Sequence, residues 1–129
     1  MDLNDRIRQV LMQHGDIRLA ILFGSLAVGR ATPASDLDLA VLMQAPLSAE
    51  TKMALIGDLS LATGRPVDLI DLRTTGEPVL GQILKHGVRL FGSDSDYAEL
   101  IKRHLFEEAD FMPYRRRILT ERRQAWIVT

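Results

Sequence analysis

The segment LFGSLAVGR at residues 22–30, followed by SDLDLAV at residues 35–41, decides the predicted fold. An apolar run over residues 17–23 ends at Gly24, which is typical of a buried strand that leads into a short helix. A second apolar run, over residues 37–43, begins with acidic residues rather than turn residues. The segment therefore predicts two strands, with a Gly-Ser turn after the first and carboxylates at the start of the second.

Two helices are predicted around these strands. An amphipathic helix should cover about residues 3–14, with Asp2 or Asn4 as its N-cap. Another should start after Ser48, which can cap it, and end at Gly64. The apolar residues of this second helix recur at spacings of three: Met53, Ile56, Leu59 and Ala62.

The remaining segments continue the alternation of strands and helices. We expect a strand over residues 67–72, a helix over 78–86, a strand over 88–91 and a helix from about 94 to 110. Pro113 should interrupt the last helix, and a basic helix should follow over residues 115–123. This order favours an α/β fold with a small mixed sheet covered by helices and a helical C-terminal extension. We expect one domain over residues 1–129, with its core over about 1–93 and the extension over about 94–129.

The composition excludes several classes of protein. With 129 residues, of which 47% are hydrophobic, the chain can form one ordinary globular core. It contains no cysteine, which excludes a disulfide framework, cysteine-ligated metals and a thiol nucleophile. The 16 Lys and Arg residues nearly balance 17 Asp and Glu residues, so direct binding of nucleic acid is not expected. Since no apolar run resembles a signal peptide or a membrane span, we expect a soluble cytoplasmic protein that does not contact a membrane.

The Gly24-Ser25 turn is a candidate phosphate site. A strand that leads into a short helix points its backbone amides, and here the Ser25 hydroxyl, outward at a positive helix end. Glycine lets the backbone approach a ligand that a Cβ atom would block. The turn is therefore expected to attract phosphate.

Asp36 and Asp38 are a candidate metal site. Side chains of a strand alternate faces with period two, so both carboxylates should project in the same direction. Two acids on one face repel each other unless a cation lies between them. Carboxylate oxygens suit Mg²⁺ or Mn²⁺, which take their remaining ligands from water and substrate phosphates.

A third acid is expected in the next strand, and two residues compete for the role. Val67 and Leu69 flank Asp68, and a carboxylate buried there without a function would cost several kcal/mol. Asp71 lies three positions further, on the opposite side of the strand and closer to a loop. We therefore favour Asp68.

Together these residues resemble the signature of the DNA polymerase β-like nucleotidyltransferase superfamily. The length of the chain is similar to that of its small branch, the minimal nucleotidyltransferases, which includes MntA-type antitoxins encoded beside HEPN-domain toxins. The resemblance implies the small mixed sheet of that superfamily. The positions that match its motif are Gly24, Ser25, Gly29, Ser35, Asp36, Asp38 and Asp68.

The resemblance implies a role for each of these positions. The Gly24-Ser25 turn would hold the terminal phosphates of the nucleotide. Asp36 and Asp38 would bind two metal ions, and Asp68 would share in metal binding and assist deprotonation of the acceptor.

Further nucleotide contacts are implied around the central motif, at Gly29 and Ser35. Many members of the family carry arginine immediately before the second glycine, where this chain has Val28. We expect Arg30 to supply the charge to phosphate instead.

The function implied by the resemblance is a metal-dependent transfer of AMP from ATP to a hydroxyl, with release of pyrophosphate. Mg²⁺ or Mn²⁺ would be the cofactor and ATP the co-substrate. The implied partner is a HEPN ribonuclease toxin, which the chain would neutralise as an antitoxin by adenylylating a tyrosine.

Two other functions are weighed against this one. A non-catalytic antitoxin would neutralise its partner by occlusion, and the Val28 departure keeps that alternative open. A small-molecule nucleotidyltransferase of the aminoglycoside type normally needs a further helical domain or a dimer to form its acceptor pocket. Only about 35 C-terminal residues are left here for that purpose.

Other conspicuous residues are expected to be structural or exposed. The three histidines, His14, His86 and His104, stand near predicted helix ends or on a charged helix, where capping or exposure is usual. The arginines between residues 115 and 123 form either a solvated face or a surface for an acidic partner or a triphosphate.

Overall fold

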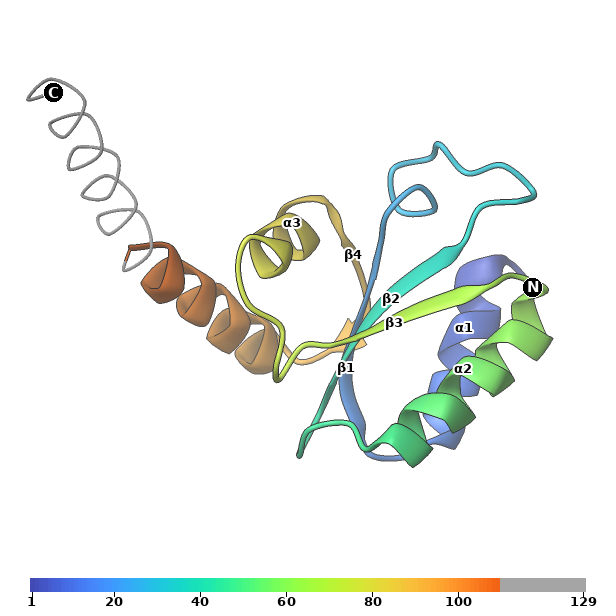
Figure 1. The fold of residues 1–129 in the computed structure, drawn as a ribbon, viewed down its shortest axis with the longest axis horizontal. Helices are drawn as coiled ribbons and strands as arrows, with labels where there is room; N and C mark the ends of the chain where they lie inside the picture. Colours follow the sequence, from blue (N-terminus) through green and yellow to red (C-terminus); the bar gives the residue numbers. More distant parts are fainter. Residues whose placement is uncertain (110–129) are drawn as a thin grey trace, which may run out of the picture.

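A four-stranded mixed sheet lies at the centre of the computed structural model, which describes residues 1–109 (Figure 1). The strands are β1 (Ile17–Phe23), β2 (Leu37–Met43), β3 (Val67–Asp71) and β4 (Val88–Gly92). Their order in the sheet is β3-β2-β1-β4. β2 and β3 run parallel, whereas β1 is antiparallel to both β2 and β4. The prediction of a small mixed sheet is therefore confirmed.

Helices cover both faces of the sheet (Figure 1). α1 (Leu3–Gln13) and α2 (Ala49–Thr63) pack together on one face. α3 (Val79–His86) and a helix over residues 94–109 lie on the other face.

Each face has its own hydrophobic core, because strand side chains alternate between the two faces. The first core joins Ala20, Leu22, Leu39 and Val41 of the strands to buried residues of α1 and α2. The second core joins strand residues of the opposite parity to α3 and to helix 94–109, and its buried members are Leu19, Ile21, Ala40, Leu42, Leu72, Leu80, Ile83 and Leu100. Since helix 94–109 contributes Leu100, it helps to cover the sheet.

The helix caps follow from local chemistry. The Asp2 carboxylate accepts a hydrogen bond from the Asp5 amide at 2.8 Å, so Asp2 rather than Asn4 is the N-cap of α1. The Ser48 hydroxyl accepts from the Thr51 amide at 3.1 Å and caps α2 as predicted.

The predicted apolar face of α2 is partly wrong. Met53 is 74% exposed, whereas Leu55 and Leu59 are buried. Ile56 and Ala62 pack only at the border of the core. Apolar residues occur on all sides of this helix, so spacing alone did not identify the buried side.

Two further predictions concern the rest of the chain. No helix within residues 1–109 is both long enough and apolar enough to span a lipid bilayer. The predicted interruption at Pro113, the helix over residues 115–123 and its arginine cluster all lie outside the described residues.

Candidate active site at one end of the sheet

The topology of the sheet brings the predicted motif residues to one end. Because β1 runs antiparallel to β2, and β2 parallel to β3, the end of β1 lies beside the starts of β2 and β3. Phe23, just before Gly24, pairs with Asp38, and Asp38 pairs with Asp68 in the parallel ladder. Both aspartates therefore project from the same face, the one that carries the second core.

Gly24 leaves room for the Asp38 carboxylate. Its φ of 72° lies in the left-handed region, which favours glycine. A Cβ atom built on Gly24 would also overlap the Asp38 carboxylate. A side chain at this position would thus displace the carboxylate, so only glycine permits this close approach.

The segment after Gly24 forms turns, and the predicted short helix is wrong. The amide of Ala27 donates to the Gly24 carbonyl at 3.1 Å, and the amide of Arg30 donates to the Ser25 carbonyl at 3.0 Å. Gly29, with a φ of 74°, ends this segment before helical hydrogen bonding can propagate.

The turn still exposes hydrogen-bond donors. Within residues 1–109, no hydrogen bond is made by the amides of Ser25 and Leu26 or by the Ser25 hydroxyl. Successive amides without an acceptor form a concave site for an anion. The turn can therefore receive a phosphate even without a helix dipole.

The carboxylates at this end repel one another. Burial, followed by the negative charges of Asp68 and Asp36, raises the pKa of the Asp38 carboxyl above its ordinary value. Asp38 is partly buried, whereas Asp36 and Asp68 are exposed. The expectation that Asp68 is buried is wrong, because β3 is an edge strand and leaves that position open to solvent.

Asp71, the competing acid, has a structural role at the opposite end of β3. Its carboxylate accepts hydrogen bonds from the amide of Leu47 at 2.8 Å and from that of Arg73 at 2.9 Å. These bonds hold the loops that follow β2 and β3. The geometry therefore favours Asp68 as the third acid of the site.

The loop before β2 is tied to the turn before β3. The Ser35 hydroxyl accepts from the Thr32 amide at 2.8 Å. Arg65 Nη1 donates to the carbonyls of Thr32, at 2.9 Å, and of Ser35, at 2.8 Å. Arg65 was not predicted from the sequence, because its contacts join segments 30 and 33 residues apart.

The other predicted nucleotide contacts, Gly29 and Arg30, lie on the exposed part of the turn. Val28, the position that departs from the family pattern, is 49% exposed. Solvent can reach this whole segment, so an extended ligand could lie along it.

The donor chemistry of this end fits a hard divalent cation. Among residues 1–109, no three His, Cys, Asp or Glu side chains are arranged to enclose a metal ion by themselves. Magnesium sites commonly use only one or two carboxylates and take further ligands from substrate phosphates and water. The carboxylates of Asp36 and Asp38, with the amides of Ser25 and Leu26 nearby for a phosphate, match that pattern.

Two of the histidines take part in tertiary contacts away from this end. His14 lies 2.8 Å from the Asp58 carboxylate and links α1 to α2. His104, on helix 94–109, lies 2.5 Å from Glu77 and 3.4 Å from Glu108. In the described part of the chain, neither ring forms a hydrogen bond with Asp36, Asp38 or Asp68.

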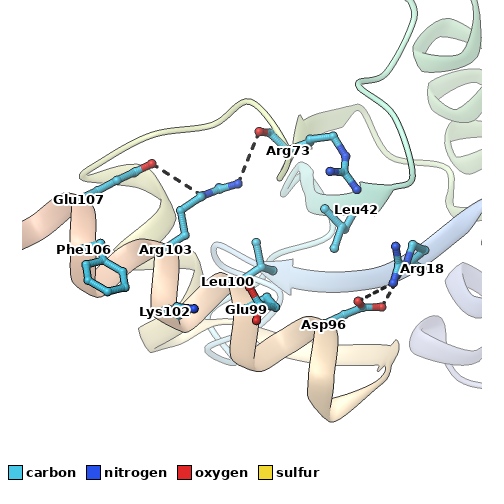
Figure 2. A pocket seen from close by; sticks show the side chains of 10 residues that line it. All are labelled: Arg18, Leu42, Arg73, Asp96, Glu99, Leu100, Lys102, Arg103, Phe106 and Glu107. Atoms are coloured by element: carbon cyan, nitrogen blue, oxygen red, sulfur yellow. Dashed lines mark hydrogen bonds and ion pairs between the residues drawn. The ribbon is translucent and has the colours of Figure 1, made fainter.

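A pocket of about 610 Å³ lies at the opposite end of the sheet (Figure 2). Four of its charged groups form ion pairs: Arg18 with Asp96 at 2.8 Å, and Arg103 with Glu107 at 3.8 Å. The guanidinium of Arg73 donates to the Met43 carbonyl. This pocket has no part in the candidate site.

Comparisons with known proteins identify the family of this chain and a relative of known activity. The family model described as "Polymerase beta, Nucleotidyltransferase" matches residues 5–96. The protein adenylyltransferase MntA of Shewanella oneidensis is 34% identical over 80 residues, which are 62% of this chain. The matched region spans 58% of the length of that relative.

Solved structures are similar over most of the chain. A toxin–antitoxin crystal structure with AMP-PNP has a TM-score of 0.82 and 26% identity, with 92% of this chain and 96% of that chain covered. A tri-AMPylated Shewanella oneidensis HEPN toxin in complex with an MNT antitoxin has a TM-score of 0.76 and 24% identity. That second match covers 92% of this chain and 94% of the other, and it supports the fold alone.

Proposed function

This chain belongs to the polymerase beta nucleotidyltransferase family, and we propose that it is an antitoxin that transfers AMP from ATP to a hydroxyl of a HEPN ribonuclease toxin. The observation that carries the proposal is the pairing of Asp38 with Asp68 beside Gly24, whose missing side chain makes room for a carboxylate. The identity to MntA and the likeness to the toxin–antitoxin structure with AMP-PNP support the same class of reaction.

In the proposed reaction, the acceptor oxygen attacks the α-phosphorus of ATP. The bond from the α-phosphorus to the oxygen that bridges to the β-phosphorus breaks, and pyrophosphate leaves with that electron pair. The proton of the acceptor hydroxyl passes to the Asp68 carboxylate, which has no competing cationic partner among the described residues.

Different residues of the site would position the triphosphate and the metal ion. The amides of Ser25 and Leu26, which donate to no acceptor within residues 1–109, would bind the terminal phosphates, and Gly29 and Arg30 lie further along the same turn. The predicted set of three carboxylate ligands is not arranged to enclose an ion within residues 1–109, so Asp36 and Asp38 would hold Mg²⁺ or Mn²⁺ together with phosphate oxygens and water. Such an ion would neutralise charge on the triphosphate and on the attacking and leaving oxygens.

The acceptor is proposed to be a tyrosine presented by the toxin. Asp36 and Asp68 are exposed at the end of an open sheet, so a side chain of another macromolecule can reach them. The 34% identity to the protein adenylyltransferase MntA supports a protein acceptor. Ser35 would act through the loop that carries Asp36, since its hydroxyl already accepts from Thr32.

Transfer of labelled AMP tests the proposal. The protein is incubated with ATP labelled at the α-phosphate, Mg²⁺ and its HEPN partner, and the modified residue is identified by mass spectrometry. We expect label on a tyrosine of the partner, and none with the Asp36→Asn/Asp38→Asn double variant. Neutralisation of the toxin by that folded double variant, without added AMP, would instead support occlusion.

A further inference from the structure

We propose that Arg65 is a positioning residue, which holds the loop before β2 so that Asp36 and Asp38 are preset for a divalent cation. The inference rests on the proposed function, since it concerns the same carboxylates. It assigns a role to an arginine that lies outside the motif itself.

Three hydrogen bonds join the two segments that carry the acids. Arg65 Nη1 donates to the carbonyls of Thr32, at 2.9 Å, and of Ser35, at 2.8 Å. Directly after Asp36, the amide of Leu37 donates to the Pro66 carbonyl at 2.8 Å. One guanidinium nitrogen thus bridges the carbonyls at both ends of the loop over residues 32–35, immediately before the first carboxylate, and adds to the loop's own bond from the Ser35 amide to the Thr32 carbonyl.

The backbone of Arg65 is itself held in place. α2 ends at Gly64, whose φ of 68° turns the chain, and the Gly64 amide donates to the Ser60 carbonyl at 2.8 Å. The Ser60 hydroxyl donates to the Arg65 carbonyl at 3.1 Å. Because the anchor is the end of a packed helix, the guanidinium offers a rigid support to an otherwise exposed loop.

The charge of Arg65 is directed to carbonyl oxygens rather than to the site carboxylates. Within residues 1–109, Arg65 forms no ion pair. An arginine bound to Asp36, Asp38 or Asp68 would compete with a cation for the same oxygens. Arg65 can therefore order the loop while it leaves the carboxylates available. Partners that orient metal ligands in this indirect way typically change metal affinity or activity by about 10–100-fold when they are removed.

The test compares Arg65→Ala and Arg65→Lys with a matched control, Arg73→Ala. Arg73 also donates to a backbone carbonyl, that of Met43, but at the opposite end of β2. We expect Arg65→Ala to raise the Mg²⁺ concentration for half-maximal transfer by about 10-fold. Arg65→Lys should give a smaller rise, since an ammonium can still donate to one carbonyl. Arg73→Ala should match the wild type.

A second readout does not depend on catalysis. Mn²⁺ alone should raise the unfolding temperature of the wild type and of Arg73→Ala, because the ion binds the folded state. The same Mn²⁺ concentration should raise the unfolding temperature of Arg65→Ala by a smaller amount. If Arg65→Ala does not fold, Arg65→Lys decides between the outcomes through the same two measurements.

Two results would overturn the inference: an unchanged Mg²⁺ requirement and Mn²⁺ response in the Arg65 variants, or equal changes in Arg73→Ala. A wild-type protein that transfers no AMP would contradict the proposed function. The Mn²⁺ measurement would in that case still decide the role of Arg65.

Discussion

The two ends of the sheet differ in the arrangement of their charged side chains. At the far end, Arg18 pairs with Asp96, and Arg103 lies beside Glu107 and donates to the Leu72 carbonyl. At the near end, three aspartates gather around the starts of β2 and β3, and the pKa of Asp38 is raised by burial and by its two acidic neighbours.

This difference distinguishes the end of the sheet where charges stabilise the fold from the end where we propose the active site. Paired charges at the far end join helix 94–109 to the sheet. Like charges at the near end oppose folding, since burial and the negative charges of Asp68 and Asp36 raise the pKa of Asp38. Local violations of good packing or charge pairing of this kind are characteristic of functional sites.

The sharpest test exchanges one carboxylate at each end of β3. Asp68→Asn should lower kcat for AMP transfer by about 10²–10⁴-fold, because the amide cannot accept the proton of the acceptor. Asp71→Asn should leave kcat unchanged and lower the free energy of unfolding by about 1–3 kcal/mol, since its carboxylate holds two loop amides. Transfer assays and urea unfolding measure the two effects. Equal loss of kcat in both variants would contradict the assignment.

The Gly24 contact can be tested against a second glycine in the same turn. Gly24→Ala and Gly29→Ala both place a Cβ atom at a positive φ, but only the first overlaps the Asp38 carboxylate. Gly24→Ala should therefore cost about 1–3 kcal/mol more in urea unfolding than Gly29→Ala, as expected for overpacking. It should also raise the Mg²⁺ requirement of transfer. Equal costs for both variants would show that Gly24 serves only the backbone turn.

The ion pair at the far end should matter little. Arg18→Ala removes the contact with Asp96, in which the arginine side chain is half exposed. We expect the free energy of unfolding to fall by less than about 1 kcal/mol and transfer to stay unchanged. A large loss of activity in this folded variant would mean that the two ends of the sheet are functionally coupled.

The smallest expected effect is a pH-dependent gain in stability from Asp38→Asn. Because the pKa of Asp38 is raised in the folded protein, the folded state keeps that proton to a higher pH than the unfolded chain. The contribution of Asp38 to the free energy of unfolding is therefore fully present below the ordinary aspartate pKa. It is lost as pH rises through the folded-state pKa. The Asp38→Asn variant does not lose stability in this way, because the asparagine amide does not titrate.

Unfolding temperatures measured without metal or nucleotide, from pH 3.5 to pH 7.5, check this sign. The variant should become more stable than the wild type as pH rises, and the difference should level off above the folded-state pKa. A difference that does not change with pH would contradict mutual repulsion at the site. Addition of Mg²⁺ and AMP-PNP should stabilise the wild type more than the variant.

Most secondary structure was predictable from the sequence because its signals are local. The predicted boundaries of β1 and β2 agree with the structure, and Ser48 and Gly64 delimit α2. Where several local patterns were possible, the prediction was less accurate. The buried side of α2 includes Leu55 rather than Met53, and Gly24-Ser25 opens a series of turns rather than a helix.

The residues of the candidate site could be predicted from the sequence, but their exposure and their contacts with distant segments could not. Gly24 and the acidic pair Asp36 and Asp38 stand out because glycine and acids interrupt apolar strands. The exposure of Asp68 was not predictable, because it depends on β3 being the edge of the sheet. Nor did any local pattern indicate that Arg65 reaches the carbonyls of a loop 30 residues earlier.

The sequence by itself determined where the strands and helices lie and which residues carry oxygen ligands, because periodicity, caps and turns depend on neighbours along the chain. The tertiary structure alone decided that Asp38 stands beside Asp68, that β3 is an edge strand and that Arg65 supports the loop before β2. These features arise from strand pairing and from contacts between distant segments. Such contacts contribute to the free energy of folding only once the sheet has formed.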